Sequence, residues 1–228
     1  MKTASQSWFV TIGRFLLWLV ILSTFLFFGA FVYTLVPFIA QFPLYILGAF
    51  ILGWLGADFV TGMIHWFGDT WGKESWPFFG KYFISDFRVH HIRPKEICGH
   101  DFVYMCASSF FFAPYIILGA VYLVTQGSLL NIVIGTFLAS TTIWAALTNV
   151  FHKWAHDDPK KVPAVVKWLQ KHRIILSPDH HQIHHTSPHI SHYAITNGWV
   201  NNLLGKIRFF RGLEWIISKI LRVKPRDY

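Results

Sequence analysis

Long apolar stretches constrain the fold of this chain more than any other feature of its sequence. Four of them cover approximately residues 15–36, 43–64, 102–124 and 129–151. Each supplies about 20 residues, the length that a helix needs to cross the hydrocarbon of a bilayer. Soluble domains of 228 residues rarely reach a hydrophobic content of 54%. The sequence therefore predicts one all-α integral membrane domain over residues 1–228, with four transmembrane helices.

The segments between these stretches predict the orientation of the chain. The links at 37–42 and 125–128 contain no charged residue, whereas all the lysines, arginines and histidines lie before residue 15, in 65–101 or in 152–228. Because basic segments stay in the cytoplasm, both termini and a cap formed by 65–101 and 152–228 are predicted to be cytoplasmic. A bacterial inner membrane and the endoplasmic reticulum both fit this topology. The net charge of +9 fits it too, so no nucleic-acid partner is expected.

Two stretches of the predicted cap, 163–176 and 207–223, mix apolar with basic residues. This pattern is typical of amphipathic helices that lie in the membrane interface. Two roles are open for them: covering a site in the cap against water, or anchoring the cap to the bilayer.

Histidines are concentrated in the cap, most densely in the segment 180–185, which contains four imidazoles. If this segment is helical, the i, i+3 and i+4 spacings place His181, His184 and His185 on one face. Packing alone does not explain such a density of histidines. They are predicted to be metal ligands, and His180 is predicted to support them.

The cytoplasmic ends of the second and fourth spans add histidines at one-turn spacing. His152 and His156 lie at i and i+4, where two imidazoles can chelate one ion, and Asn149 shares their face one turn earlier. His65 ends the second span, and Asp69 follows one turn later. Asp69 can either bind a metal directly or orient His65.

Other polar residues of the cap and spans are further candidates. His90 and His91 would point about 100° apart on a helix, so either they reach different metals or one of them supports a ligand. His100, at the start of the third span, is expected to be structural or to support a ligand. Asp58 is a carboxylate inside a span and must face protein or a cavity, where it can hold a ligand in place. Three histidines have no spacing that predicts ligation: His172, His189 and His192.

The number and type of these ligands indicate the metal. Zinc takes about three protein ligands in a catalytic site and four, usually including cysteine, in a structural one. Eight or more histidines exceed one zinc site, and nitrogen-rich ligation of two ions favours iron. Two irons can together reduce O2 to a species that takes hydrogen from an unactivated C–H bond, and a site at the membrane face suits lipid chains. Neither HExxH nor GxSxG occurs, which argues against metalloproteases and serine hydrolases.

Five motifs carry a family resemblance that extends from about Gly53 to Trp215. They are His65-Trp66…Asp69-Thr70-Trp71-Gly72, Phe87-Arg88-Val89-His90-His91-Ile92-Arg93-Pro94, His100-Asp101-Phe102, His152-Lys153-Trp154-Ala155-His156 and His180-His181-Gln182-Ile183-His184-His185. In this order they resemble the lipid desaturase family, which includes the plasmanylethanolamine desaturases of plasmalogen synthesis and a plant plastid palmitate desaturase.

The resemblance implies a di-iron site and identifies its ligands. Eight histidines match the metal-binding set of the family: His65, His90, His91, His152, His156, His181, His184 and His185. Five residues are then expected to support them or to be additional ligands: Asp58, Asp69, His100, Asn149 and His180. In plasmanylethanolamine desaturases an acidic residue and an Asn-Gly-type segment follow His-Asp-Phe, whereas here the chain continues with residues 103–109, VYMCASS. This departure bears on the lipid and not on the metal chemistry.

The resemblance also implies the reaction, an O2-dependent lipid desaturation. The expected substrate is the 1-O-alkyl chain of an ether phospholipid, which would become a vinyl ether. Electrons would come from an external donor, a cytochrome b5 or ferredoxin system. Four basic residues near the interface are expected to contact the head group or this donor: Arg88, Arg93, Lys95 and Lys153.

Three alternatives stay open at the level of sequence. The enzyme could desaturate or hydroxylate an ester-linked or free fatty acyl chain. From another class, the chain could be a zinc-dependent membrane lipid amidase or hydrolase. It could also be a non-catalytic membrane protein that binds metal or lipid.

Overall fold

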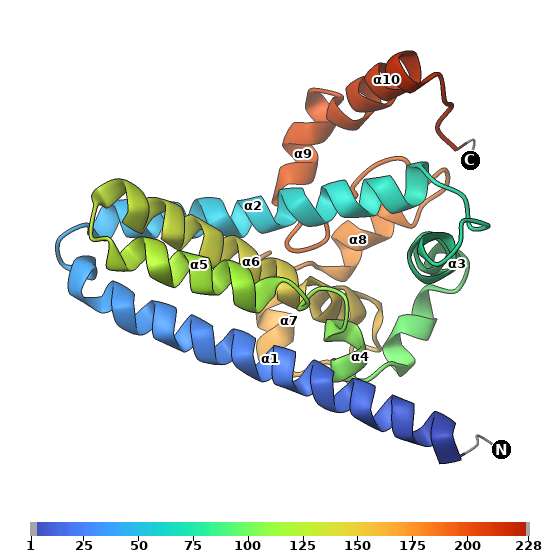
Figure 1. Cartoon of the computed structure of the whole chain (residues 1–228). Helices are drawn as coiled ribbons and strands as arrows, with labels where there is room; N and C mark the ends of the chain where they lie inside the picture. Colours follow the sequence, from blue (N-terminus) through green and yellow to red (C-terminus); the bar gives the residue numbers. More distant parts are fainter. Residues whose placement is uncertain (1–3, 227–228) are drawn as a thin grey trace. The chain divides into compact units, whose positions relative to one another are not determined.

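The computed structural model describes residues 4–226, and side chains for 11–226 except 82, so the outermost residues of the predicted domain lie outside this range. All regular elements within 4–226 are helices (Figure 1). Contacts divide the chain into two units. Unit 1 consists of Met1–Ala57 and His100–Val150, and unit 2 of Asp58–Gly99 and Phe151–Tyr228.

Three helices are long and apolar enough to cross a membrane. They are Thr11–Ile39 within α1 (Ala4–Ile39), α2 (Pro43–Thr70) and α6 (Leu129–His156). These helices contain the predicted spans 15–36, 43–64 and 129–151. Both α2 and α6 continue beyond the predicted spans, so each contributes to both units. The first, second and fourth predicted spans therefore correspond to apolar helices of sufficient length.

The single helix predicted over 102–124 is not present. The structure has α4 (Phe102–Cys106) and α5 (Ala113–Thr125) instead, separated by turns. Pro114 lies in the first turn of α5, where its missing N–H and fixed φ suit the start of a helix. With 13 residues, α5 is about 20 Å long, which is less than the hydrocarbon thickness.

Side chains in unit 1 satisfy backbone groups around this break. Asn149 Nδ2 donates to the carbonyl oxygen of Met105 at 3.1 Å, and Ser109 Oγ donates to that of Ala146 at 2.7 Å. Non-helical backbone at membrane depth needs partners of this kind, because lipid supplies no hydrogen bonds. Asn149 therefore supports the break between α4 and α5.

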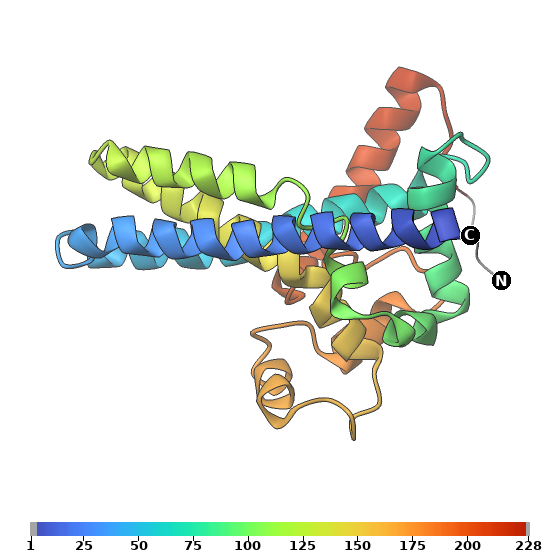
Figure 2. The same ribbon diagram turned by 60° about the horizontal axis from the view of Figure 1, so that its bottom comes forward.

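The core of unit 1 combines apolar packing with a close helix approach. Helices α1 and α5 lie side by side (Figures 1 and 2), and Phe31, Leu35 and Ile117 belong to their shared core. Helices α2 and α6 meet at Gly53, where a Cβ atom would lie 2.6 Å from Ser140 Cβ. Small residues at such a crossing let two helix backbones pack closely in a membrane.

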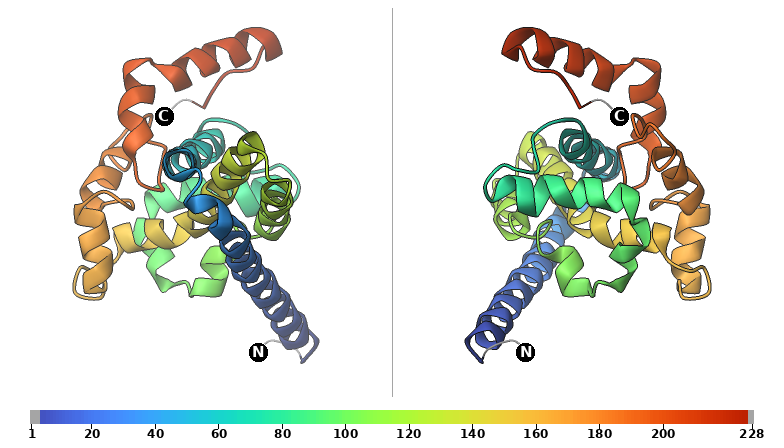
Figure 3. Two further views of the ribbon diagram at one scale, coloured as in Figure 1. Left: turned by 90° about the vertical axis from the view of Figure 1, so that its left-hand side faces the viewer. Right: turned by 90° about the vertical axis from the view of Figure 1, so that its right-hand side faces the viewer.

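Unit 2 corresponds to the predicted cap, extended by the last turns of α2 and the end of α6. Its other elements are η1 (Gly80–Ile84), α3 (Ser85–Ile92), η2 (Pro94–Gly99), α7 (Ala164–Lys171), α8 (Pro178–His184), α9 (Trp199–Lys206) and α10 (Phe209–Leu221). The predicted amphipathic stretches contain α7 and α10, whereas α9 was not predicted. Figure 3 shows α9 leading into α10, after which the chain turns back.

Both amphipathic helices leave apolar side chains exposed. On α7, Val165 and Trp168 are exposed while Val166 is buried. On α10, Trp215 and Ile220 are exposed, whereas Phe210 and Glu214 on the opposite side are buried. Each helix thus attaches to unit 2 by one side and presents an apolar surface on the other.

We expect Gly53→Ala to lower the thermal unfolding temperature of the purified protein. The added methyl group would meet Ser140 and the carbonyl oxygen of Phe137, and such overpacking typically costs about 1–3 kcal/mol. Gly48→Ala is the matched control, because a Cβ atom there meets no described residue within 4 Å. It should raise stability by up to about 1 kcal/mol through helix propensity. Equal stability of the two variants would contradict a close α2–α6 contact.

Candidate metal centre

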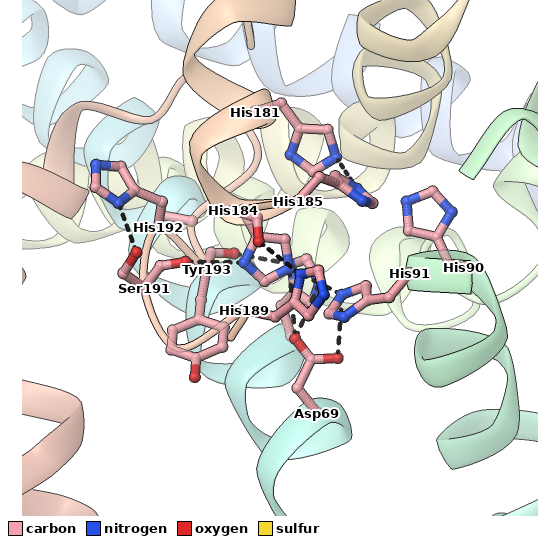
Figure 4. A network of polar contacts seen from close by, with 12 residues as sticks. Asp69, His90, His91, His181, His184, His185, His189, Ser191, His192 and Tyr193 are labelled. Carbon is pink, nitrogen blue, oxygen red and sulfur yellow. Dashed lines mark hydrogen bonds and ion pairs between the residues drawn. The ribbon is translucent and has the colours of Figure 1, made fainter. Parts of the chain in front are cut away.

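Nine side chains, from α2, α3, α6 and the segment 181–185, converge at their metal-binding atoms. Figure 4 shows Asp69, His90, His91, His181, His184 and His185 among them. We name the two resulting sets the five-histidine group and the Asp69 group. The first contains His90, His152, His156, His181 and His185, and the second contains His65, Asp69, His91 and His184. Within each group the candidate ligand atoms all lie within 4.8 Å of one another. The structure thus brings together all eight histidines for which the sequence predicted ligation.

The Nε2 atoms of the five-histidine group are spaced like ligands of one ion. His156 Nε2 lies 3.0 Å from that of His90, 3.2 Å from that of His152 and 2.9 Å from that of His181. The Nε2 atoms of His181 and His185 are 3.0 Å apart. Ligands at about 2.1 Å from an ion and at right angles to each other lie about 3.0 Å apart. The nitrogens therefore surround a space of the right size for one metal ion.

The Asp69 group combines three imidazoles with a buried carboxylate. Asp69 oxygens lie 3.4 Å from His65 Nε2 and 3.5 Å from the Nε2 atoms of His91 and His184. Neither carboxylate oxygen forms a hydrogen bond with any residue that the structure describes, although Asp69 is only 1% exposed. Burying an ionised carboxylate without a partner is costly, and a cation between these atoms would offset the cost. The donor set therefore fits a bound metal ion.

Backbone carbonyls fix the orientation of two imidazoles in the Asp69 group. His65 Nδ1 lies 3.0 Å from the carbonyl oxygen of Tyr193, and His184 Nδ1 lies 2.8 Å from that of Ser191. A carbonyl can only accept, so each Nδ1 carries the hydrogen and each Nε2 keeps its lone pair. This arrangement orients histidines for ligation through Nε2.

One face of α2 holds the segment that supplies these carbonyls. Asp58 Oδ1 accepts hydrogen bonds from the backbone amides of Thr196, Asn197 and Gly198 at 2.9–3.0 Å, and its Oδ2 accepts one from Val200 at 3.1 Å. Two turns further along the same face, His65 meets the Tyr193 carbonyl. Asp58 thus holds the backbone of residues 196–200 against α2, and its support of a metal ligand stays a prediction.

His180 also belongs to this supporting structure and to neither ligand group. Its Nε2 accepts a hydrogen bond of 3.0 Å from Asn201 Nδ2, and Asn201 also bonds both backbone groups of Ala194. Gly198 adopts a positive φ of 84°, and a Cβ atom there would collide with the His180 ring. The contact of His180 with this turn therefore requires glycine at position 198.

Helix α3 carries one histidine to each group. Phe87 packs directly on the α2 backbone, since a Cβ atom at Gly68 would lie 2.7 Å from the ring. Arg88 Nη2 donates to the carbonyl oxygens of Trp71 and Gly72 at 3.2 and 2.9 Å, which ties α3 to the end of α2. His90 then joins the five-histidine group and His91 the Asp69 group, as one of the two sequence-based alternatives anticipated.

Burial keeps the histidines outside the spanning helices neutral. It lowers the pKa of His90 and of His91 to about 2, with neighbouring imidazoles adding to the effect. Burial, and then His189, lowers the pKa of His185 to about 4. At neutral pH these rings are unprotonated, so their lone pairs are available to a metal.

Several other predicted residues lie apart from the two groups. His100 stacks on Tyr104 in unit 1, with ring centroids 3.9 Å apart. Arg93 pairs with Glu96 at 2.9 Å, Lys95 is exposed and Lys153 is half-buried. Contacts of the basic residues with a head group or an electron donor stay predictions.

Sequence reasoning missed His189, which lies at the Asp69 group. Its ring centroid is 4.6 Å from that of His91, and its Nδ1 lies 3.1 Å from the carbonyl oxygen of His184. His189 follows α8 outside any helical spacing, so the i, i+4 pattern could not identify it. The carbonyls of Ser191 and Tyr193 were missed because backbone acceptors leave no mark in the residue types.

We expect Asp58→Asn to destabilise the protein although the side chain keeps its shape. The variant loses a charged acceptor and turns an amide donor toward a backbone N–H, at a cost of about 1.5–3 kcal/mol per charged hydrogen bond. The measurement is thermal unfolding, and Asp86→Asn, an exposed change on α3, is the control. Equal unfolding temperatures would refute the supporting role of Asp58.

Comparison with known proteins supplies the family. A family model described as the lipid desaturase domain matches residues 54–228. Plasmanylethanolamine desaturase of Myxococcus xanthus is 41% identical over 80% of this chain, and plasmanylethanolamine desaturase 1 of Mus musculus is 38% identical over 81%. Fatty acid desaturase 4, chloroplastic, of Arabidopsis thaliana is 30% identical over 77%.

The matches cover 64%, 69% and 53% of the lengths of these three relatives. The chain thus spans less than two thirds of the Myxococcus and Arabidopsis proteins. The comparison with solved structures gave no match. The family match includes all nine side chains of the two ligand groups. The chain belongs to the lipid desaturase family.

Proposed function

We propose that this protein is a membrane-bound lipid desaturase whose two ligand groups each hold one iron ion. The observation that carries this proposal is the side-by-side arrangement of the groups. The rings of His91 and His185, one from each group, have centroids only 5.3 Å apart. Two ions held this close can act on the same molecule of O2 and the same substrate carbon chain.

The donor atoms support iron over zinc. Five imidazoles in one group exceed the four ligands of a tetrahedral zinc site, and the right-angle spacing of their nitrogens suits a higher coordination number. Three imidazoles with one carboxylate in the other group are also a nitrogen-rich donor set. Cys98 and Cys106 belong to neither group.

The proposed reaction removes two hydrogens from neighbouring carbons of a lipid chain. The iron ions would supply the activation of O2 that this oxidation needs. O2, two electrons and two protons are consumed together with the two substrate hydrogens, and the products are a carbon–carbon double bond and two water molecules. The electrons come from an external donor of the cytochrome b5 or ferredoxin type.

Residues of this chain prepare the site for such a reaction. The carbonyls of Tyr193 and Ser191 aim two imidazoles, and burial keeps the ligand rings neutral. His65, His181 and His184 are each at most 1% exposed, so bulk water has little access to these three side chains. Exclusion of water protects reactive species from side reactions.

The preferred substrate is the 1-O-alkyl chain of an ether phospholipid, which would become a vinyl ether. Two relatives named plasmanylethanolamine desaturase, at 41% and 38% identity, support this choice. The relative named fatty acid desaturase 4, at 30% identity, supports the runner-up, desaturation or hydroxylation of an acyl chain.

The proposed topology places unit 2 on the cytoplasmic side of a bacterial inner membrane or the endoplasmic reticulum. Helices α1, α2 and α6 cross the membrane, and the segment 102–125 completes a fourth crossing through α4, the turns and α5. The exposed apolar surfaces of α7 and α10 lie in the interface. In this topology Arg93, Lys95 and Lys153 would lie near the membrane surface and contact a head group or the electron donor, whereas Arg88 ties α3 to the end of α2.

Purified protein should contain two iron ions per chain, as measured by elemental analysis. His184→Ala should lower the iron content, because it removes one Nε2 donor from the Asp69 group and leaves a cavity at a buried position. His172→Ala is the control, since His172 is exposed and belongs to neither group. One zinc and no iron in the wild-type protein would contradict the proposal and favour the hydrolase alternative.

Cells that lack plasmalogens should form them when they express this protein and are supplied with an alkylglycerol. Acid releases a fatty aldehyde from a vinyl ether, so aldehyde in acid-treated lipid extracts measures the product. Cells that express His184→Ala should give none. New unsaturated ester chains without acid-labile lipid would instead show that the enzyme acts on acyl chains.

A further inference from the structure

Two of the three imidazoles in the Asp69 group are oriented by the backbone, and the third is not. His65 and His184 each donate from Nδ1 to a backbone carbonyl oxygen. His91 has no such carbonyl partner among the described residues. Its polar contacts are those of Nε2, with His184 Nε2 at 3.0 Å and with Asp69 Oδ1 at 3.5 Å. The direction of the His91 ring therefore depends on a contact of another kind.

The place of His91 on α3 makes such a contact important. It lies in the last turn of α3, which ends at the next residue, Ile92. Helix ends fray, and the contacts that tie α3 to α2 come from Phe87 and Arg88, about one turn earlier. The backbone of α3 therefore holds His91 less firmly than the longer helix α2 holds His65.

Among the described residues, the aromatic ring nearest to His91 is that of His189, from the loop after α8 (Figure 4). The two ring centroids are 4.6 Å apart, whereas those of His91 and His184 are 4.8 Å apart. The His189 side chain is itself held, because its Nδ1 lies 3.1 Å from the carbonyl oxygen of His184. His184 ends α8, where the last carbonyls lack donors within the helix. The Nδ1–H of His189 satisfies one of these carbonyls.

The backbone at His189 adopts a conformation that does not favour a histidine. Its φ is 61°, in the left-handed region where glycine and asparagine are the usual residues. Residues persist in such conformations where the surrounding contacts hold them, and they cluster at functional sites. Here the contacts are those of the imidazole with His91 and with the end of α8. The side chain, and not the turn, therefore accounts for a histidine at this position.

We propose that His189 is a positioning residue that holds the His91 imidazole in the Asp69 group. Its ring packs against His91 on α3, while its Nδ1–H anchors it to the end of α8. His189 thereby fixes two candidate ligands from different helices, His91 and His184, relative to each other. It belongs to neither ligand group and acts through His91. The proposal rests on the proposed function, because it assumes an ion in the Asp69 group.

Competition with a chelator tests this role in full-length protein that is purified in detergent with its iron. Increasing chelator concentrations remove the ions, and elemental analysis measures the iron that stays bound per chain. In His189→Asn, one of the two ions should be lost at a chelator concentration about 10–100-fold lower than in the wild type, the usual effect of removing a residue that orients a ligand. The other ion should be lost at the wild-type concentration, because the hydrogen bond and the closest ring contact of His189 are with the Asp69 group.

His192→Asn is the matched control. His192 lies in the same loop with a left-handed φ of 58°, but its ring packs on His180, which belongs to neither group. This variant should release both ions at the wild-type concentrations. Because asparagine suits a left-handed backbone, both variants should unfold at or above the wild-type temperature in excess chelator. Loss of both ions together from His189→Asn, with a lower unfolding temperature than the control, would show a merely structural role and overturn the inference.

Mössbauer spectra of the iron-loaded protein identify the affected ion. The two ligand groups contain different donors, so their ions should give separate signals. In His189→Asn only one of these signals should change. Unchanged signals, or equal changes in both, would overturn the inference.

Lipid analysis separates this inference from the proposed function. If the wild-type protein oxidises lipid and His189→Asn keeps both ions at wild-type affinity, the inference fails and the desaturase stands. If the wild-type protein holds zinc and oxidises no lipid, while His189→Asn selectively loses the ion of one group, the desaturase fails and the positioning role of His189 stands.

Discussion

The carboxylate of Asp58 accepts hydrogen bonds from four backbone amides, and the geometry of the candidate metal centre depends on this contact. It fixes residues 196–200 against α2, and Tyr193, three residues before this segment, places its carbonyl at His65. A buried carboxylate is costly without partners, so these amides and Asp58 require one another. The result is a loop whose backbone carbonyl sets the tautomer of His65.

Burial has opposite consequences for the two kinds of ligand. It favours neutral imidazoles, which is the form that binds metal, whereas it leaves the Asp69 carboxylate without hydrogen bonds in the described chain. A bound cation would meet both conditions, since it would accept the lone pairs and offset the negative charge. Such an ion would also stabilise the folded form of unit 2, because the unfolded chain does not hold these side chains together.

Much of the convergence of these side chains could be predicted because most of them follow helical spacing. The pairs His65–Asp69 and His152–His156 lie at i, i+4 on helices whose apolar composition also identifies them. The third span could not be predicted as two helices, because the break at residues 107–112 contains no charged residue, glycine or proline. Partners far apart in the sequence, such as Asp58 with residues 196–200, leave no local pattern.

Two short helices determine how far apart the ligand groups lie. His90 and His91 are adjacent on α3, yet each belongs to a different group, and α8 likewise divides His181 from His184. The separation of the two groups is thus set by the geometry of α3 and α8 and not by loop conformation. Insertion of one residue between either pair would rotate a ligand by about 100° and dismantle both groups together. The loop 157–161 contains no member of either group. Its length can therefore change without altering the spacing of the histidines on α3 or α8.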